Sequence, residues 1–139
     1  MSESARGIVV AHGTLALALV QEAERISGET GVLVAVSNTD CGKEEIEQRV
    51  AEAVGEGPAV FFVDMPCGSC FFAAMRLARG RSDIRVVTGV NLPMLLKLAT
   101  IREGASSVSE IAQLITGYGQ KNIVFASELL GTRRESARR

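Results

Sequence analysis

The only histidine of the chain, His12, lies where an apolar run stops and a helical pattern begins. An imidazole can serve as a nucleophile when an acceptor holds the proton of one ring nitrogen, because the other nitrogen then keeps its lone pair. Asp64 follows another apolar run, "AVFFV", and supplies a carboxylate that could be this acceptor. We therefore predict that His12 and Asp64 form a catalytic pair.

The residues that follow Asp64, "MPCGSC", lead into a further helical pattern. Backbone amides at a helix N-terminus bind anions, a glycine lets the anion approach closely, and a serine hydroxyl adds a donor. Together with a nucleophilic histidine, such a cradle describes a phosphohistidine site. The residues predicted to contact the phosphoryl group are Gly13, Cys67, Gly68 and Ser69.

Each of these residues also has a simpler interpretation. Taken alone, His12 would be a polar loop residue, Asp64 would cap a turn, and Ser69 would be a helix N-cap. The functional interpretation therefore depends on whether the fold brings the two stretches together.

Short Val-rich runs alternate with helical patterns along the chain and predict the strands of a sheet. Strict alternation of strand and helix is typical of a doubly wound α/β fold, in which a mainly parallel sheet carries helices on both faces. Ligands bind in such folds beyond the carboxyl ends of the strands, where the winding reverses. If the first and third strands are neighbours, His12 faces Asp64 at that edge. The predicted strands are 8–11, 32–36, 59–63 and 84–87.

Apolar residues at helical spacing predict the buried face of each helix. Pro93 suits the first turn of a fourth helix, and Ser107 with Glu110 forms a capping box that opens a fifth. The segment "NIVFA", 122–126, follows a turn signal and predicts a last strand. The predicted buried positions are Leu15, Leu19, Ala23 and Ile26 in the first helix, Ile46, Val50, Ala53 and Val54 in the second, and Phe71, Ala74, Met75 and Ala78 in the third.

The composition is that of an ordinary soluble domain. The chain has 139 residues, with 15 Lys and Arg against 16 Asp and Glu, which indicates neither nucleic acid nor an acidic membrane surface as a partner. No apolar run approaches the roughly 18 residues of a membrane span, and the N-terminus has no signal-peptide pattern, so we expect a cytoplasmic protein. We assign residues 1–130 to one domain and residues 131–139 to a polar tail.

Other cofactor and metal chemistries have little support from the sequence. The first predicted strand is followed neither by a dinucleotide-binding glycine motif nor by a nucleotide-binding lysine loop. The three cysteines are an odd number, which argues against a disulfide framework, and scattered thiols beside one histidine make a poor zinc site. We therefore expect reduced thiols, no cofactor and no metal.

Three motifs carry a resemblance to a known family: "VVAHGTLALAL", "FFVDMPCGSC" and "VVTGVNLPMLL", at the ends of the first, third and fourth predicted strands. The chain resembles the enzyme IIA component of the mannose-type (mannose/fructose/sorbose, type-4) bacterial phosphotransferase system, from about residue 6 to residue 126. The resemblance implies the strand order 2-1-3-4, and a C-terminal strand that is exchanged between the subunits of a homodimer.

The resemblance also implies what the site does. A phosphocarrier of this family takes a phosphoryl group from the histidine phosphocarrier protein and passes it to a sugar-specific enzyme IIB, associating with a membrane transporter peripherally at most. His12 matches the phosphorylated histidine, Asp64 its paired carboxylate, and Ser69 the serine of a Gly-Gly-Ser-Pro stretch that contacts the phosphoryl group. Here that stretch reads "CGSC" and departs from the pattern. Because the chain ends without a IIB domain, we expect the acceptor to be a separate polypeptide.

Two other functions compete with this interpretation. A two-component receiver would be phosphorylated on Asp64, with Thr88 nearby, but it holds Mg²⁺ with further carboxylates after the first strand, where this chain reads "AHG". A thiol redox protein would use Cys67 and Cys70, whose C-x-x-C spacing lies at a predicted helix start. The simpler interpretation of both cysteines is that they fill space.

Overall fold

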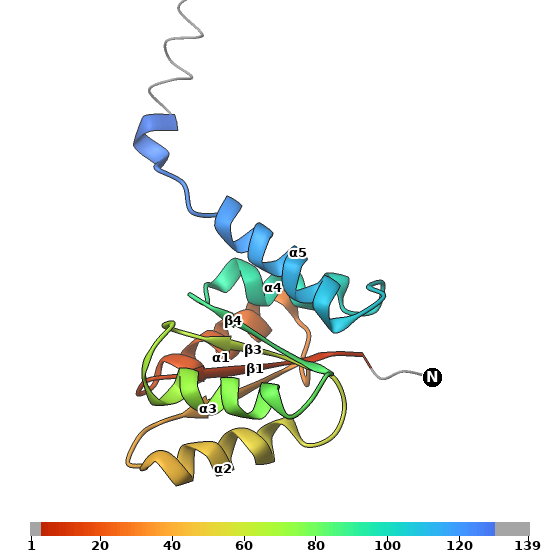
Figure 1. The fold of residues 1–139 in the computed structure, drawn as a ribbon. Helices are drawn as coiled ribbons and strands as arrows, with labels where there is room; N and C mark the ends of the chain where they lie inside the picture. Colours follow the sequence, from red (N-terminus) through yellow and green to blue (C-terminus); the bar gives the residue numbers. More distant parts are fainter. Residues whose placement is uncertain (1–3, 130–139) are drawn as a thin grey trace, which may run out of the picture.

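The computed structural model describes residues 4–129, which fold around one parallel sheet (Figure 1). Its strands are β1 (Arg6–Ala11), β2 (Leu33–Ser37), β3 (Ala59–Val63) and β4 (Ile84–Thr88). The strand order is β2-β1-β3-β4, which confirms the predicted doubly wound fold and its 2-1-3-4 order. The reversal of winding lies between β1 and β3, the two central strands.

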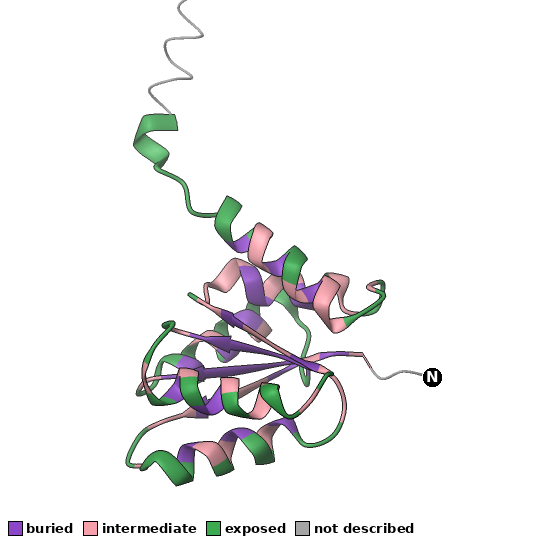
Figure 2. Cartoon of the chain, viewed as in Figure 1, coloured by how far each residue is buried: buried purple, intermediate pink, exposed green. Residues whose placement is uncertain are grey.

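Helices cover both faces of this sheet (Figure 1). They are α1 (Leu15–Ser27), α2 (Lys43–Val54), α3 (Gly68–Arg79), α4 (Leu92–Ile101) and α5 (Val108–Lys121). The first, fourth and fifth close one apolar core, and the second and third close another on the opposite face. In β3, Phe61 points into one core and Phe62 into the other, and both rings are fully buried. The whole of β3 is buried (Figure 2). Burial on both faces explains why β3 is apolar throughout rather than alternating.

The predicted buried faces are right for α2 but partly wrong for α1 and α3. Both of these helices carry apolar residues on nearly every side of their first turns, so helical spacing alone does not decide which side is buried. As a result, Leu15 is turned outward and Cys70 inward. The buried residues are Ala16, Val20 and Ala23 in α1, Ile46, Val50 and Val54 in α2, and Cys70, Ala73 and Ala74 in α3.

Capping residues mark the starts of α4 and α5. The Asn91 side chain accepts a hydrogen bond from the Met94 amide at 3.1 Å at the start of α4. The Ser107 hydroxyl accepts one from the Glu110 amide at 3.1 Å at the start of α5. The Glu110 carboxylate, however, accepts from Ser106. The predicted capping box is therefore formed only in its first half.

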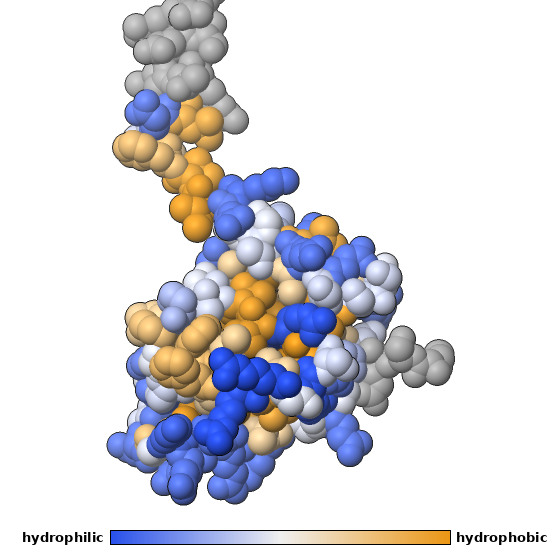
Figure 3. All heavy atoms as spheres, viewed as in Figure 1, coloured by the Kyte–Doolittle hydropathy of each residue, from blue (hydrophilic) through white to orange (hydrophobic). Residues whose placement is uncertain are grey.

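The predicted last strand, 122–126, does not form in the described chain. α5 runs to Lys121, and the segment after it leaves the body of the molecule without joining the sheet (Figure 1). A strand needs a neighbouring strand to take up its backbone hydrogen bonds, and the single chain offers this segment none among residues 4–129. Ile123, Val124 and Phe125 are 76%, 54% and 74% exposed and form an apolar stretch at the base of the projecting segment (Figure 3). The exchange of this segment between subunits stays a prediction.

The polar tail predicted for residues 131–139 lies outside the described residues, as does residue 130. Across residues 4–129, no helix combines the length and the apolar character needed to cross a membrane.

Candidate active site

β1 and β3 end side by side, and each carries one of the predicted catalytic residues. Their parallel pairing sets Val10 against Val63, so His12 and Asp64 leave the sheet at the same edge. The Nδ1 atom of His12 lies 2.7 Å from the Oδ2 atom of Asp64, and the His12 amide donates to the same oxygen at 3.0 Å. The structure thus brings the two predicted side chains into direct contact.

The surroundings of Asp64 keep its carboxyl ionised at neutral pH. Burial raises the pKa of this carboxyl, but hydrogen bonds from the amide and ring of His12 and from the Met65 amide outweigh burial, so the pKa lies below its ordinary value. An ionised carboxylate can only accept a hydrogen bond, and Nδ1 of His12 is therefore the donor. In the neutral ring the lone pair is then on Nε2, which is the tautomer that nucleophilic attack requires.

The two side chains differ in how far they reach the surface. The His12 side chain is 42% exposed and that of Asp64 only 10%, so a partner can reach the ring but not the carboxylate behind it. Gly68 lies against the ring: a Cβ atom at this position would be 3.8 Å from both Cε1 and Nε2 of His12. Its φ of +88° is in the left-handed region that favours glycine. The backbone at the start of α3 therefore passes beside Nε2.

This helix start has the features of an anion site. α3 begins at Gly68, with the exposed Cys67 as its N-cap. The first amides of a helix have no partner within it and attract negative charge. Ser69 lies in the same turn, but no hydrogen bond within the described part of the chain joins it to His12. Among the residues predicted to hold a phosphoryl group, Gly68 is found against the ring.

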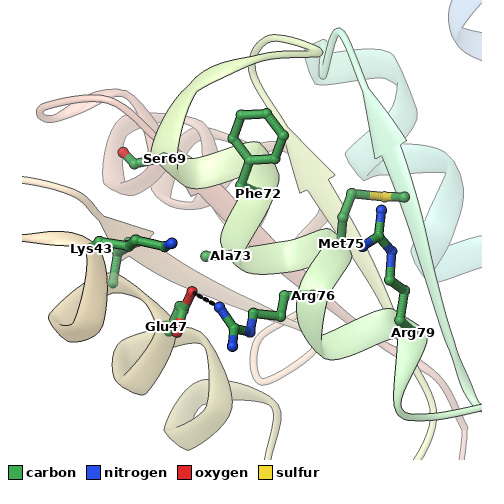
Figure 4. A pocket seen from close by; sticks show the side chains of 9 residues that line it. Lys43, Glu47, Ser69, Phe72, Ala73, Met75, Arg76 and Arg79 are labelled. Carbon is green, nitrogen blue, oxygen red and sulfur yellow. Dashed lines mark hydrogen bonds and ion pairs between the residues drawn. The ribbon is translucent and has the colours of Figure 1, made fainter.

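A groove between α2 and α3 begins at Ser69 and continues along α3 as far as Arg79 (Figure 4). Its lining mixes charged and apolar side chains, and Arg76 pairs with Glu47 within it at 3.3 Å. The side chains that give it this character are Lys43, Phe72, Met75, Arg76 and Arg79.

The loop after β1 is braced by residues at the end of β2. The Gly13 amide donates to the Asn38 side chain at 3.1 Å, and the Gly13 carbonyl accepts from the Ser37 hydroxyl at 2.7 Å. The Gly13 amide would therefore have to leave Asn38 in order to bind a phosphoryl oxygen. Sequence reasoning missed this bracing role, although the polar pair stands at the carboxyl end of the strand next to β1.

Cys70 lies beneath the catalytic pair, in the first turn of α3. It is fully buried, and its Sγ atom, a ring nitrogen of His12 and a carboxylate oxygen of Asp64 all lie within 4.8 Å of one another. Burial, followed by the charge of Asp64 and the influence of Cys41, raises the pKa of Cys70 to about 11. The thiol is therefore neutral at neutral pH, which does not favour the redox alternative with Cys70 as a nucleophile.

The geometry does not favour the receiver alternative either. A receiver holds its metal ion between its aspartate and further carboxylates. Here both oxygens of Asp64 accept hydrogen bonds, from His12 and from Met65. In the group of potential metal ligands that residues 4–129 bring together, Asp64 is the sole carboxylate.

A family model described as the fructose IIA component of the phosphotransferase system matches residues 7–126. The chain belongs to this family. The family resemblance seen in the sequence is confirmed, and residues 7–126 form a domain of the phosphotransferase IIA family.

Curated relatives of this IIA chain are named for different sugars. The mannose-specific EIIAB component of Escherichia coli (strain K12) is 27% identical over 121 residues, which make up 84% of this chain but 38% of that protein. The fructose-specific EIIA component of Bacillus subtilis (strain 168) is 26% identical over 128 residues, 88% of this chain and 87% of the relative. The sorbose-specific EIIA component of Klebsiella pneumoniae is 33% identical over 94 residues, 66% of this chain and 70% of the relative. The IIA chain thus spans less than half the length of the first of these relatives.

Solved structures share its fold. The EIIA component from Streptococcus agalactiae matches with a TM-score of 0.82 at 21% identity, over 88% of this chain and 98% of that one. The mannose/sorbose-specific IIA subunit from Enterococcus faecalis matches with a TM-score of 0.76 at 24% identity, over 88% and 94% of the two chains. At these identities the likeness establishes the fold of the IIA chain.

Proposed function

We propose that this IIA chain is a phosphocarrier in which His12 accepts a phosphoryl group from the histidine phosphocarrier protein and passes it to a separate enzyme IIB. This phosphoryl transfer would serve sugar uptake or its regulation. The observation that carries the proposal is the 2.7 Å contact between His12 Nδ1 and Asp64 Oδ2, which leaves Nε2 as the free nitrogen of an accessible ring. Family membership supports the choice of donor and acceptor.

The proposed reaction moves a phosphoryl group between two histidine rings. The Nε2 lone pair of His12 attacks the phosphorus atom of the donor phosphohistidine and forms a new N–P bond. The donor's N–P bond breaks, and its electron pair returns to the donor ring. The Nδ1 proton stays in place, and the Asp64 carboxylate stabilises the positive charge that the His12 ring gains. The amides at the start of α3 face the phosphoryl oxygens, and transfer to enzyme IIB repeats these steps with His12 as donor.

Exposed apolar side chains at this end of the sheet support exchange with protein partners. Leu15 and Leu17 on α1 are 43% and 54% exposed, Met65 is 44% exposed, and Phe72 on α3 is 63% exposed. Contiguous exposed apolar side chains mark protein interaction sites more often than sites for polar small molecules. A partner that covered them would exclude water from His12 during transfer.

Incubation with phosphoenolpyruvate, enzyme I and the histidine phosphocarrier protein tests the proposal. We expect the mass of the IIA chain to increase by one phosphoryl group, and only when all three are present. The group should be lost in mild acid and survive base, as phosphohistidine does. No increment, or one that resists acid and is lost in base as an acyl phosphate on Asp64 would be, contradicts the proposal.

Replacing Gly68 by alanine is expected to slow this phosphorylation and to lower the free energy of unfolding by about 1–3 kcal/mol, the cost of holding a residue in a strained backbone conformation. The added Cβ would lie 3.8 Å from Nε2, an ordinary contact that leaves the ring in place but occupies space needed by a phosphoryl group. Initial rates and thermal unfolding measure the two effects.

Gly28→Ala is the matched control, because Gly28 has a similar φ of +76° and nothing within 4 Å of its Cβ position. It should lose stability without slowing phosphorylation. If Gly68→Ala is phosphorylated as fast as Gly28→Ala, the start of α3 is not the phosphoryl cradle.

We also propose that the chain is a homodimer that exchanges its C-terminal segment. Deletion from Asn122 onward is expected to convert a dimer into a monomer in sedimentation analysis, because it removes the exposed apolar stretch of Ile123, Val124 and Phe125. Deletion of residues 130–139 alone keeps that stretch and should leave the dimer intact. A dimer that survives the longer deletion rules out exchange.

A further inference from the structure

The fold assembles three potential metal ligands that lie far apart in the sequence. His12 follows β1, Asp64 follows β3, and Cys70 lies in the first turn of α3. One ligand atom from each, a ring nitrogen, a carboxylate oxygen and Sγ, lies within 4.8 Å of the other two. The thiol plays no part in the proposed phosphoryl transfer, so its position beneath the pair calls for a separate account.

This set of donor atoms matches the ligands of zinc. Zn²⁺ binds imidazole nitrogen, carboxylate oxygen and thiolate sulfur at about 2.0–2.3 Å, which separates tetrahedral ligand atoms by roughly 3.3–3.8 Å. The three atoms here are within 4.8 Å of one another, and the ring and carboxylate touch at 2.7 Å, so shifts of about 1 Å in the positions of the side-chain atoms would place them around a common ion. Mg²⁺ and Ca²⁺ require more oxygen ligands than this single carboxylate supplies.

The exposure of the three residues also suits a metal site with one coordination position open to solvent. Asp64 and Cys70 form the floor, with 10% and 0% exposure, while the His12 side chain is 42% exposed. A bound ion would therefore have protein ligands beneath it and a water molecule on its solvent side. On binding, Sγ forms a bond to the metal and the thiol proton passes to solvent, so the net charge of the site rises by one.

We propose that His12, Asp64 and Cys70 form a Zn²⁺ site, and that Zn²⁺ binding and phosphorylation of His12 exclude each other. The coordination claim stands on the three ligands alone, whereas the exclusivity rests on the proposed function. Coordination through Nε2 takes up the lone pair that attacks phosphorus, and coordination through Nδ1 shifts the Nδ1 proton to Nε2. In both cases Nε2 has no lone pair left for the phosphoryl group. Zn²⁺ would then hold the carrier in its unphosphorylated form.

Cobalt(II) tests the coordination claim without any phosphorylation, because a cobalt–thiolate bond absorbs in the near ultraviolet. We expect this absorption when Co²⁺ is added to the reduced protein, and its loss on competition with Zn²⁺. It should disappear in Cys70→Ala and persist in Cys67→Ala and Cys41→Ala, which remove the two other thiols of the chain. Circular dichroism shows whether Cys70→Ala is folded, and Cys70→Ser replaces it if not.

Two spectroscopic results would overturn the site. One is a wild-type protein that shows no thiolate absorption with Co²⁺. The other is an absorption that survives loss of the Cys70 thiol or disappears with Cys67 or Cys41.

Phosphorylation rates measured across a Zn²⁺ series test the exclusivity. Half-inhibition of Cys70→Ala should need at least about 10-fold more Zn²⁺ than half-inhibition of Cys41→Ala, since losing even an outer partner of a metal site weakens binding that much. Because all variants share the same enzyme I and phosphocarrier protein, inhibition of those proteins would affect them equally. Equal sensitivity of the two variants contradicts exclusivity. A chain that takes no phosphoryl group even without Zn²⁺ contradicts the proposed function, and the cobalt spectra then still decide the metal site.

Discussion

Replacing His12 by alanine is expected to abolish phosphorylation of the chain while leaving it folded. The chain has no other histidine, so no second imidazole can take over. The ring is 42% exposed and its main polar contact is the hydrogen bond to Asp64. Its loss should lower the free energy of unfolding by no more than about 1.5–3 kcal/mol, the range for a hydrogen bond to a charged group. Radiolabel transfer from phosphoenolpyruvate measures the first effect and thermal unfolding the second.

Thr14→Ala controls for disturbance of the same loop, because Thr14 is exposed and its side chain makes no capping hydrogen bond to α1. This variant should be labelled like the wild type. If His12→Ala still takes label, the acceptor is another residue, and an acyl phosphate on Asp64 becomes the first alternative to examine.

Replacing Asp64 by asparagine is expected to slow phosphorylation by up to about 10⁴-fold, the effect of the same change in the catalytic triad of a hydrolase. The amide keeps the size of the carboxylate but loses its charge. It can also present an N–H group to Nδ1, which would favour the tautomer with its proton on Nε2. The lone pair would then point at residue 64 instead of at the donor. Initial rates at saturating phosphocarrier protein measure the loss.

Asp83→Asn makes the same chemical change outside the site, where Asp83 pairs with Arg81 at 3.0 Å just before β4. It should keep the wild-type rate. If Asp64→Asn also keeps that rate, the contact between Asp64 and His12 does not contribute to catalysis.

The fold was predictable from sequence wherever a local pattern has only one solution. The short, Val- and Phe-rich apolar run of β3 is typical of a central strand between two layers of helices, and alternation of strand and helix then indicates a parallel sheet. The segment 122–126 has the same strand-like composition, but a strand also needs a neighbour, which the single chain does not provide. The composition of a segment indicates that its side chains would be buried, but it does not indicate whether a neighbouring strand is available to pair with it.

The candidate site was also predictable in one part and not in another. His12 and Asp64 were predictable as neighbours because both follow strands, and strand order alone brings them together. The place of Cys70 depends on the rotation of α3 about its axis, which shifted by one residue from the predicted face of Phe71, Ala74 and Met75. A helix that is apolar on most sides carries no sequence signal for such a shift.

The single histidine also makes possible the most direct test of the central claim. In untagged protein whose histidine is labelled with ¹⁵N, every imidazole signal comes from His12, and two-dimensional NMR separates phosphorylation at Nδ1 from phosphorylation at Nε2. Because Asp64 holds Nδ1 at 2.7 Å, we predict that the phosphoryl group appears on Nε2 and that Nδ1 keeps its proton. A phosphoryl group on Nδ1, or a phosphorylated chain whose imidazole signals do not change, would contradict the account.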